Sequence, residues 1–101
     1  MVRGPDPDPD RGVYGISVAA ELVGSLPPNL RLYEAKGLLT PARSDGNTRR
    51  YSDNDLARIR DIVQLLDAGL NLAGVERVLE LQAANQQLQQ EIERLTRKLS
   101  N

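Results

Sequence analysis

The most regular pattern in the chain is a heptad repeat of hydrophobic positions near the C-terminal end of the sequence. After Gly74 no proline or glycine interrupts the chain, which favours one long helix with Asn71 as its N-cap. Spacings of alternately three and four residues predict a coiled coil of about three heptads, formed by Val78, Leu81, Asn85, Leu88, Ile92, Leu95 and Leu99. A second stripe, predicted to dock on the preceding helix, consists of Leu72, Val75 and Leu79. The alternative is a helix folded back on its own domain, but the first 70 residues offer few apolar faces to receive it.

A shorter amphipathic pattern precedes this helix and predicts another helix from Ser52 to about Ala68. Ser52 is a suitable N-cap, and Asp53 and Asp55 fall in the first turn, where the helix dipole favours negative charge. Gly69 follows as a stop signal. The apolar positions of this segment lie on one side of a helix and are Leu56, Ile59, Val63 and Leu66.

Two short helices are predicted in the first part of the chain. Ser17 is a plausible N-cap for a helix through Val23, with Val18 and Leu22 facing inward, and Gly24 ends it. The second helix begins near Pro27, because proline is tolerated in a first turn, and it ends at Gly37. Within it Leu30 and Tyr33 share one face, which leaves Arg31 pointing elsewhere.

The segment from Leu38 to Tyr51 predicts a basic β-hairpin. Leu38 and Leu39 should anchor its first strand, Pro41 confines that strand to a sheet edge, and Asp45-Gly46 suits a type I′ or related turn. Two helices joined around a glycine, followed by a hairpin, predict a winged helix-turn-helix domain over residues 13–70. The fold class is therefore mainly α, with a C-terminal helix over 71–101. Residues 1–12 alternate Pro and Asp and are interpreted as a disordered acidic tail.

Composition excludes several function classes. The sequence contains no Cys and no His, which excludes disulfides, thiolate metal sites, imidazole bases and nucleophilic thiols. The carboxylates fall on helix surfaces and caps, so no catalytic set is predicted and the protein is expected not to be an enzyme. No long apolar run is present, which predicts neither a signal peptide nor a membrane span and makes the cytoplasm the default location.

The net charge of −1 is unevenly distributed. Residues 25–60 hold seven Lys or Arg against four acidic residues, a net charge of +3, whereas residues 1–24 and 61–101 each carry −2. The positive charge therefore lies on the segment that would face DNA, and its modest size predicts modest non-specific affinity.

Four separated stretches, ISVAAELVG, LRLYEAKGLL, RRYSDNDLARI and GLNLAGVERVLEL, together resemble the DNA-binding region of the MerR family of bacterial transcription regulators, and most closely its heat-shock repressor (HspR) branch. The resemblance covers residues 16–82. It implies a homodimer that joins through an antiparallel coiled coil, places its second helix in a major groove and lays its wing along the backbone. The candidate DNA-binding residues are Asn29, Arg31, Tyr33, Arg43, Arg49, Arg50 and Tyr51.

The residues leave some points of this interpretation open. Each tyrosine is explained equally well by packing alone or by packing with its hydroxyl on a phosphate. Pro28 stands where relatives usually carry a polar residue, and Leu32 where most MerR relatives carry tyrosine. Asn85 at an a position is typical of parallel coiled coils, whereas the resemblance implies an antiparallel pair. Residues 78–99 would span about 33 Å as a helix, close to the ~34 Å between half-sites one DNA turn apart.

The expected function is sequence-specific DNA binding by a dimeric transcription regulator, acting as a repressor on a palindromic promoter site. The resemblance further implies a chaperone of the Hsp70 type as co-repressor. With no Cys or His, no metal or redox cofactor is expected. Two other functions remain open at this stage: a coiled-coil module that binds proteins, and a monomeric architectural or excisionase-like DNA binder.

Overall fold

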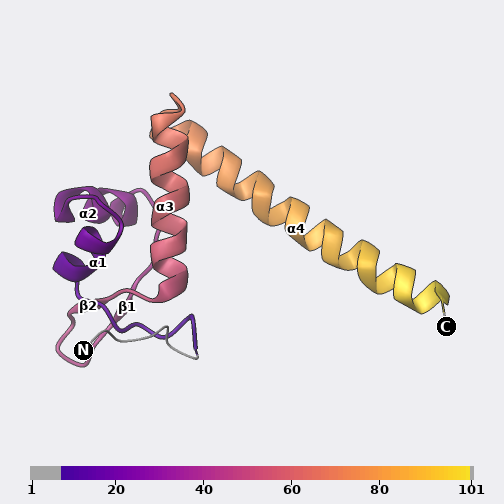
Figure 1. Ribbon diagram of the computed structural model, residues 1–101, viewed down its shortest axis with the longest axis horizontal. Helices are drawn as coiled ribbons and strands as arrows, with labels where there is room; N and C mark the ends of the chain where they lie inside the picture. Colours follow the sequence, from indigo (N-terminus) through magenta and orange to yellow (C-terminus); the bar gives the residue numbers. More distant parts are fainter. Residues whose placement is uncertain (1–7, 101) are drawn as a thin grey trace.

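The computed structural model describes residues 8–100, and these residues form a helical head from which one long helix projects (Figure 1). The order is α1 (Ile16–Leu22), α2 (Pro27–Ala35), β1 (Ala42–Arg43), β2 (Arg49–Arg50), α3 (Asp53–Asp67) and α4 (Leu72–Ser100). The longest dimension is 49 Å, because the outer part of α4 lies away from the head. The predicted helical head with a hairpin between its second and third helices is confirmed, as is the long C-terminal helix.

The head is held by one hydrophobic core to which every helix contributes. Its largest fully buried side chains are Tyr51, Leu30, Ile59, Ile62 and Val75. Within α3 the buried line runs through Leu56, Ile59 and Ile62, so the predicted stripe is shifted, since Val63 and Leu66 are only partly buried. The shift follows from the position of α3, which lies between the α1–α2 pair and the first turns of α4 (Figure 1).

The prediction for α1 is wrong in two respects. The helix begins at Ile16 with Gly15 as the N-cap, and no side chain caps it, so Ser17 does not have the predicted role. Val18 and Leu22 are about half exposed, at 50% and 49%, while Ala19 and Ala20 are buried. Small alanine side chains let α1 pack closely against the core, which turns the larger residues outward.

The predicted helix ends are mostly confirmed. Gly24, Gly37 and Gly69 follow α1, α2 and α3, and all three have positive φ angles, the left-handed conformation that glycine adopts without steric strain. Ser52 forms a capping box, in which its hydroxyl accepts a hydrogen bond from the Asp55 amide at 3.0 Å. The Asn71 side chain accepts one from the Gly74 amide at 2.8 Å and so caps α4.

The hairpin is short and its turn differs from the predicted one. Ala42 pairs with Arg50 and Arg43 pairs with Arg49 in an antiparallel register. The residue with a positive φ is Asn47, at 64°, and its amide donates to the Ser44 carbonyl at 2.8 Å. A left-handed residue at the end of a three-residue loop is a common hairpin connection. The left-handed position therefore falls on Asn47, and not on Asp45-Gly46 as a type I′ turn would require.

Residues 8–12 are folded against the head, which corrects the interpretation of the first twelve residues as a disordered tail; residues 1–7 lie outside the described part. The Asn54 amide donates to the Pro9 carbonyl at 3.0 Å, and the Asn54 side chain donates to Asp10 at 2.6 Å. A β-carbon on Gly12 would lie 2.7 Å from the Arg50 carbonyl oxygen. Glycine is therefore required for the N-terminal segment to pass so close to the wing. Two residues later, Tyr14 forms an isolated antiparallel β-bridge with Tyr51.

The buried Tyr51 hydroxyl has no hydrogen-bond partner among the described residues. A buried polar group without a partner costs about 1–3 kcal/mol, so Tyr51→Phe is expected to raise the free energy of unfolding by about 1 kcal/mol. Urea denaturation would measure this change. Tyr14→Phe is the matched control with the opposite sign, because the Tyr14 hydroxyl donates to Asp53 at 2.8 Å. A lower stability for Tyr51→Phe would contradict the prediction.

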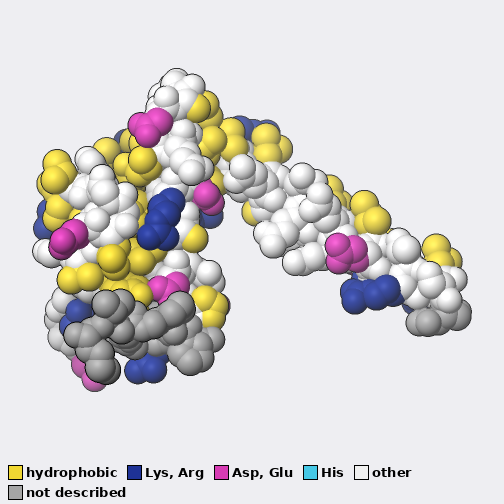
Figure 2. Space-filling view, in the orientation of Figure 1, with side chains coloured by type: hydrophobic (Ala, Val, Ile, Leu, Met, Phe, Trp, Pro, Cys, Tyr) yellow, Lys and Arg dark blue, Asp and Glu magenta, His cyan; other side chains and the backbone are white. Residues whose placement is uncertain are grey.

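The long helix α4 has two parts with different surroundings. Val75 and Leu79 are buried against α3, as the docking stripe predicted. From Leu81 onward every described residue is exposed, and Figure 2 shows hydrophobic side chains spaced along one edge of this part. The exposed large hydrophobic side chains of the predicted seam are Leu81, Leu88, Ile92, Leu95 and Leu99.

Candidate nucleic-acid interface

The helix α2 has a buried side and an exposed side. Leu30 and Tyr33 point into the core, and Arg31 is exposed. Within residues 8–100 no carboxylate forms an ion pair with Arg31, so its guanidinium is available to a ligand. Asn29 is also exposed, and its side-chain amide donates to the Ser25 hydroxyl at 3.1 Å, which fixes its position at the start of α2.

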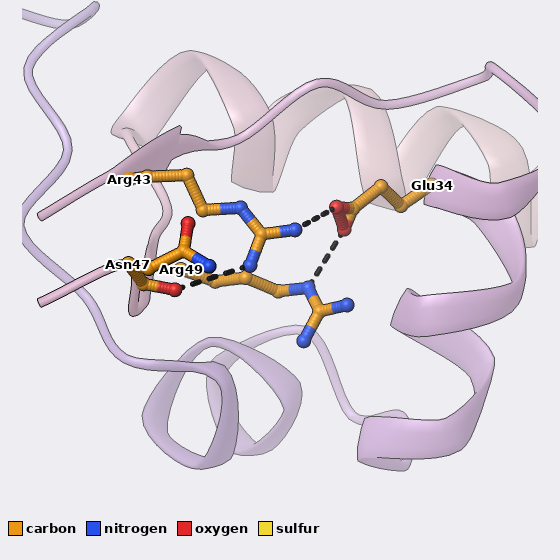
Figure 3. A network of polar contacts seen from close by, with 4 residues as sticks. All are labelled: Glu34, Arg43, Asn47 and Arg49. Atoms are coloured by element: carbon orange, nitrogen blue, oxygen red, sulfur yellow. Dashed lines mark hydrogen bonds and ion pairs between the residues drawn. The ribbon is translucent and has the colours of Figure 1, made fainter.

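A network centred on Glu34 joins α2 to the wing (Figure 3). One carboxylate oxygen of Glu34 lies 2.8 Å from Arg43 Nη2, and the other lies 2.7 Å from Arg49 Nε. Arg43 also donates to the Asn47 carbonyl at 3.3 Å, so it connects the tip of the hairpin to α2. One carboxylate thus holds both strands of the wing in a defined position relative to the exposed helix.

The electrostatics of this network follow from its hydrogen bonds. The hydrogen bond from Arg49 is the main cause that lowers the pKa of the Glu34 carboxyl, with the charges of Arg49 and Arg43 adding to it. The same bond raises the pKa of Arg49. Glu34 therefore stays ionised and Arg49 stays cationic at neutral pH. In Figure 3 the two terminal nitrogens of Arg49 point away from Glu34, which leaves N–H donors for a further partner.

Arg50 lies on the other side of the hairpin. It is exposed, and one of its guanidinium nitrogens lies 3.4 Å from the position that a β-carbon on Gly15 would take. Arg50 thus passes beside the start of α1, and no carboxylate within residues 8–100 pairs with it. Lys36, which follows α2, is exposed as well.

The two tyrosines among the candidates lie in the core. Tyr51 is fully buried and Tyr33 is 5% exposed. Burial is also the main cause that raises the pKa of both phenols. Of the two interpretations that the sequence left open, packing therefore fits Tyr51, whose hydroxyl is closed off from solvent.

Sequence reasoning missed Glu34 as the residue that organises the wing. An acidic residue beside Arg31 and Tyr33 gave no positive signal for a DNA-binding role. The two arginines that it holds are nine and fifteen residues away, so only the folded hairpin brings them together. The available clue was a lone acidic side chain within the otherwise uncharged or basic stretch from Pro27 to Arg43.

Replacement of Glu34 by glutamine is expected to lower thermal stability at neutral pH, because it removes the charge that holds Arg43 and Arg49. The folded-state pKa of Glu34 lies below its ordinary value of 4.5. The stabilisation is therefore complete above that value and is lost as the pH falls through the lower, folded-state pKa. Melting curves from pH 7 downward would show the difference between variant and wild type disappear in acid. Glu80→Gln in α4, which breaks an exposed pair with Arg77, is the control and should leave the head unaffected.

Across residues 8–100 no three acidic side chains gather to form a metal-binding cluster. None of the helices in the same range combines the length and the apolar character needed to cross a membrane.

Comparison with known proteins identifies the family. Residues 14–82 match the family model described as MerR HTH family regulatory protein, and the chain belongs to this family. A Streptomyces coelicolor protein assigned as heat shock protein HspR is 47% identical over 81 residues, which cover 79% of this chain and 54% of that protein. The HTH-type transcriptional regulator GlnR of Bacillus anthracis is 37% identical over 67 residues, which cover 66% of this chain and 52% of GlnR.

The fold agrees with that assignment. The crystal structure of HiNmlR, a MerR family regulator lacking the sensor domain and bound to promoter DNA, aligns with a TM-score of 0.66 at 25% identity. The alignment covers 86% of this chain and 78% of HiNmlR. The chain spans about half the length of the curated relatives that it matches.

Proposed function

We propose that this protein is a dimeric, sequence-specific DNA-binding regulator of transcription that represses a promoter by occupying a palindromic site. The observation that carries the proposal is the exposed and unpaired Arg31 on α2 beside a wing whose arginines are held in place by Glu34. Membership in the MerR family and the promoter DNA bound by HiNmlR support it. Such a regulator would act in the cytoplasm, at the nucleoid.

The exposed side chains divide by their chemistry into those suited to contact base edges and those suited to contact phosphates. An arginine can donate two parallel hydrogen bonds to O6 and N7 of guanine in a major groove, and we assign this role to Arg31. Asn29 at the start of α2 is a second candidate for a base edge. The wing arginines suit phosphates, which set the register of the protein on the duplex. Arg49 can use its two terminal nitrogens for this purpose while its Nε remains on Glu34.

The surroundings of α4 support the proposed dimerisation. An isolated helix with no tertiary packing is only marginally stable in water, and from Leu81 onward every described residue of α4 is exposed in the single chain. Its exposed a and d residues bury their side chains if a second copy supplies the same seam. An antiparallel pair would separate the two heads by about one turn of DNA. We therefore propose an antiparallel arrangement, in which Asn85 faces a d-type residue of the partner.

A binding assay with duplex DNA tests the proposal. Affinity should fall steeply as salt is added, because phosphates neutralised by Lys and Arg release their counterions. Binding of a protein partner through the head, with no affinity for any duplex in dilute buffer, would favour the coiled-coil interaction module instead. A monomer in sedimentation that still binds DNA would favour the architectural binder.

The wing arginine Arg50 provides a more specific check. Arg50→Ala is expected to reduce the slope of log affinity against log salt by about one unit, with little change in base preference. Fluorescence anisotropy at several salt concentrations, with a specific and a scrambled duplex, would measure both quantities. If Arg50→Ala changes base preference and leaves the slope unchanged, Arg50 contacts a base instead of a phosphate.

A co-repressor of the Hsp70 chaperone type is proposed on the resemblance and on the name of the Streptomyces coelicolor relative. Purified chaperone added to the binding assay should then raise the affinity for the specific duplex. An unchanged affinity would reject this partner and leave simple promoter occupancy as the mechanism.

A further inference from the structure

The exposed side of α2 carries a stripe of apolar side chains that the proposed arginine contacts leave unexplained. Pro28, Leu32 and Ala35 are spaced by four and three residues, which places them on one side of the helix. All three are exposed. Leu32 is 42% accessible to solvent, whereas Leu30 and Tyr33 on the other side of α2 are buried. Single exposed apolar residues are common, but these three share the side of α2 that the proposed function places against the bases.

The charges around this stripe restrict what it can contact. Arg31 borders it on one side, and Lys36 follows at the end of the helix, both exposed. Glu34, the only acidic residue of α2, is held by the two wing arginines. The stripe is therefore apolar, flanked by cations and without a free carboxylate. This combination fits the major groove of DNA, where phosphates flank base edges.

The major groove offers one apolar group, the C5-methyl of thymine. We propose that Leu32, with Pro28 beside it, is a specificity-determining residue that contacts a thymine methyl and so selects an A·T pair next to the base contacted by Arg31. This inference rests on the proposed DNA-binding function and names the base class that the function needs. Pro28 has no backbone N–H to donate to DNA, so what it contributes to this contact is an apolar surface.

Deoxyuridine tests the contact, because it pairs with adenine as thymidine does and lacks only the methyl group. A binding site is first selected from random duplexes, and each of its thymidines is then replaced singly by deoxyuridine. One replacement per half-site is expected to lower affinity about fourfold, the effect of withdrawing one methyl group from an apolar contact. The other replacements should have no effect.

Variants of the protein assign the penalty to Leu32. In Leu32→Ala the thymidine and deoxyuridine duplexes should bind equally, whereas Leu32→Met, which keeps the side chain long and apolar, should retain the preference. Leu22→Ala is the matched control, since Leu22 is a leucine of similar exposure, at 49%, on α1; it should keep the full preference. Because Leu32 is exposed, its replacement is not expected to disturb folding, which circular dichroism would verify.

The outcomes separate this inference from the function on which it rests. Selection of a site without any deoxyuridine penalty would overturn the methyl contact while leaving DNA binding intact. A penalty that persists in Leu32→Ala would likewise overturn it, by assigning the methyl to another side chain. Failure to bind any duplex at low salt would overturn the proposed function itself.

Discussion

Leu88→Lys is expected to convert the proposed dimer into monomers. Leu88 is 63% exposed in the single chain and lies at a d position near the middle of the seam. In a dimer its replacement would bury a lysine from each copy, and burial of an unpaired charge is far too unfavourable for a short seam to tolerate. Sedimentation velocity at micromolar concentration should show the loss of the dimer, and affinity for a palindromic duplex should fall with it.

The control for this variant is Gln90→Lys. It adds the same charge two residues further along α4, on the side of the helix away from the seam, so it should leave the dimer intact. Leu88 is neither in the core of the head nor among the side chains packed against it, so the fold of the head should survive in both variants. Persistence of the dimer in Leu88→Lys would place the interface on another surface.

Arg31→Ala is expected to lower the affinity for the specific site by about 1–3 kcal/mol and to relax the preference at one base pair. The reason is that Arg31 is exposed and unpaired on the described part of the chain, so truncation removes a contact without breaking an internal one. Competition between the selected site and single-base variants would measure the change. The free energy of unfolding should stay near that of the wild type.

Two comparisons make this result interpretable. Arg77→Ala removes an exposed arginine of α4 that pairs with Glu80, and it should leave specific binding unchanged. A uniform loss of affinity for every sequence in Arg31→Ala would make Arg31 a phosphate contact and transfer base recognition to other side chains, with Leu32 and Asn29 the nearest candidates.

Several features of the fold could be predicted from the sequence because they depend on neighbouring residues. Helix ends at Gly24, Gly37 and Gly69 follow from the left-handed conformation that glycine permits. The cap at Ser52 needs only the residue three positions later, Asp55. The seam of α4 depends on spacing alone, and the absence of Cys and His excludes thiolate and imidazole chemistry whatever the fold.

Other features were decided by tertiary packing. The exposure of Val18 and Leu22 could not be predicted, because an amphipathic pattern with two adjacent alanines fits either orientation until the neighbours of α1 are known. The position of residues 8–12 depends on the hydrogen bond from Asn54 to Asp10 and on the close approach of Gly12 to the Arg50 backbone. Both Asn54 and Arg50 are distant in sequence from this segment.

The candidate interface shows the same division. The sequence by itself determined which side chains could contact DNA, since arginines near a helix and a hairpin are visible in the composition and order of residues. Only the tertiary structure decided that Tyr51 is enclosed in the core, that Glu34 fixes two wing arginines, and that Leu32 is exposed. The physical reason is that burial and ion pairing depend on which distant segments meet, whereas caps, stops and heptads are encoded within a few neighbouring residues.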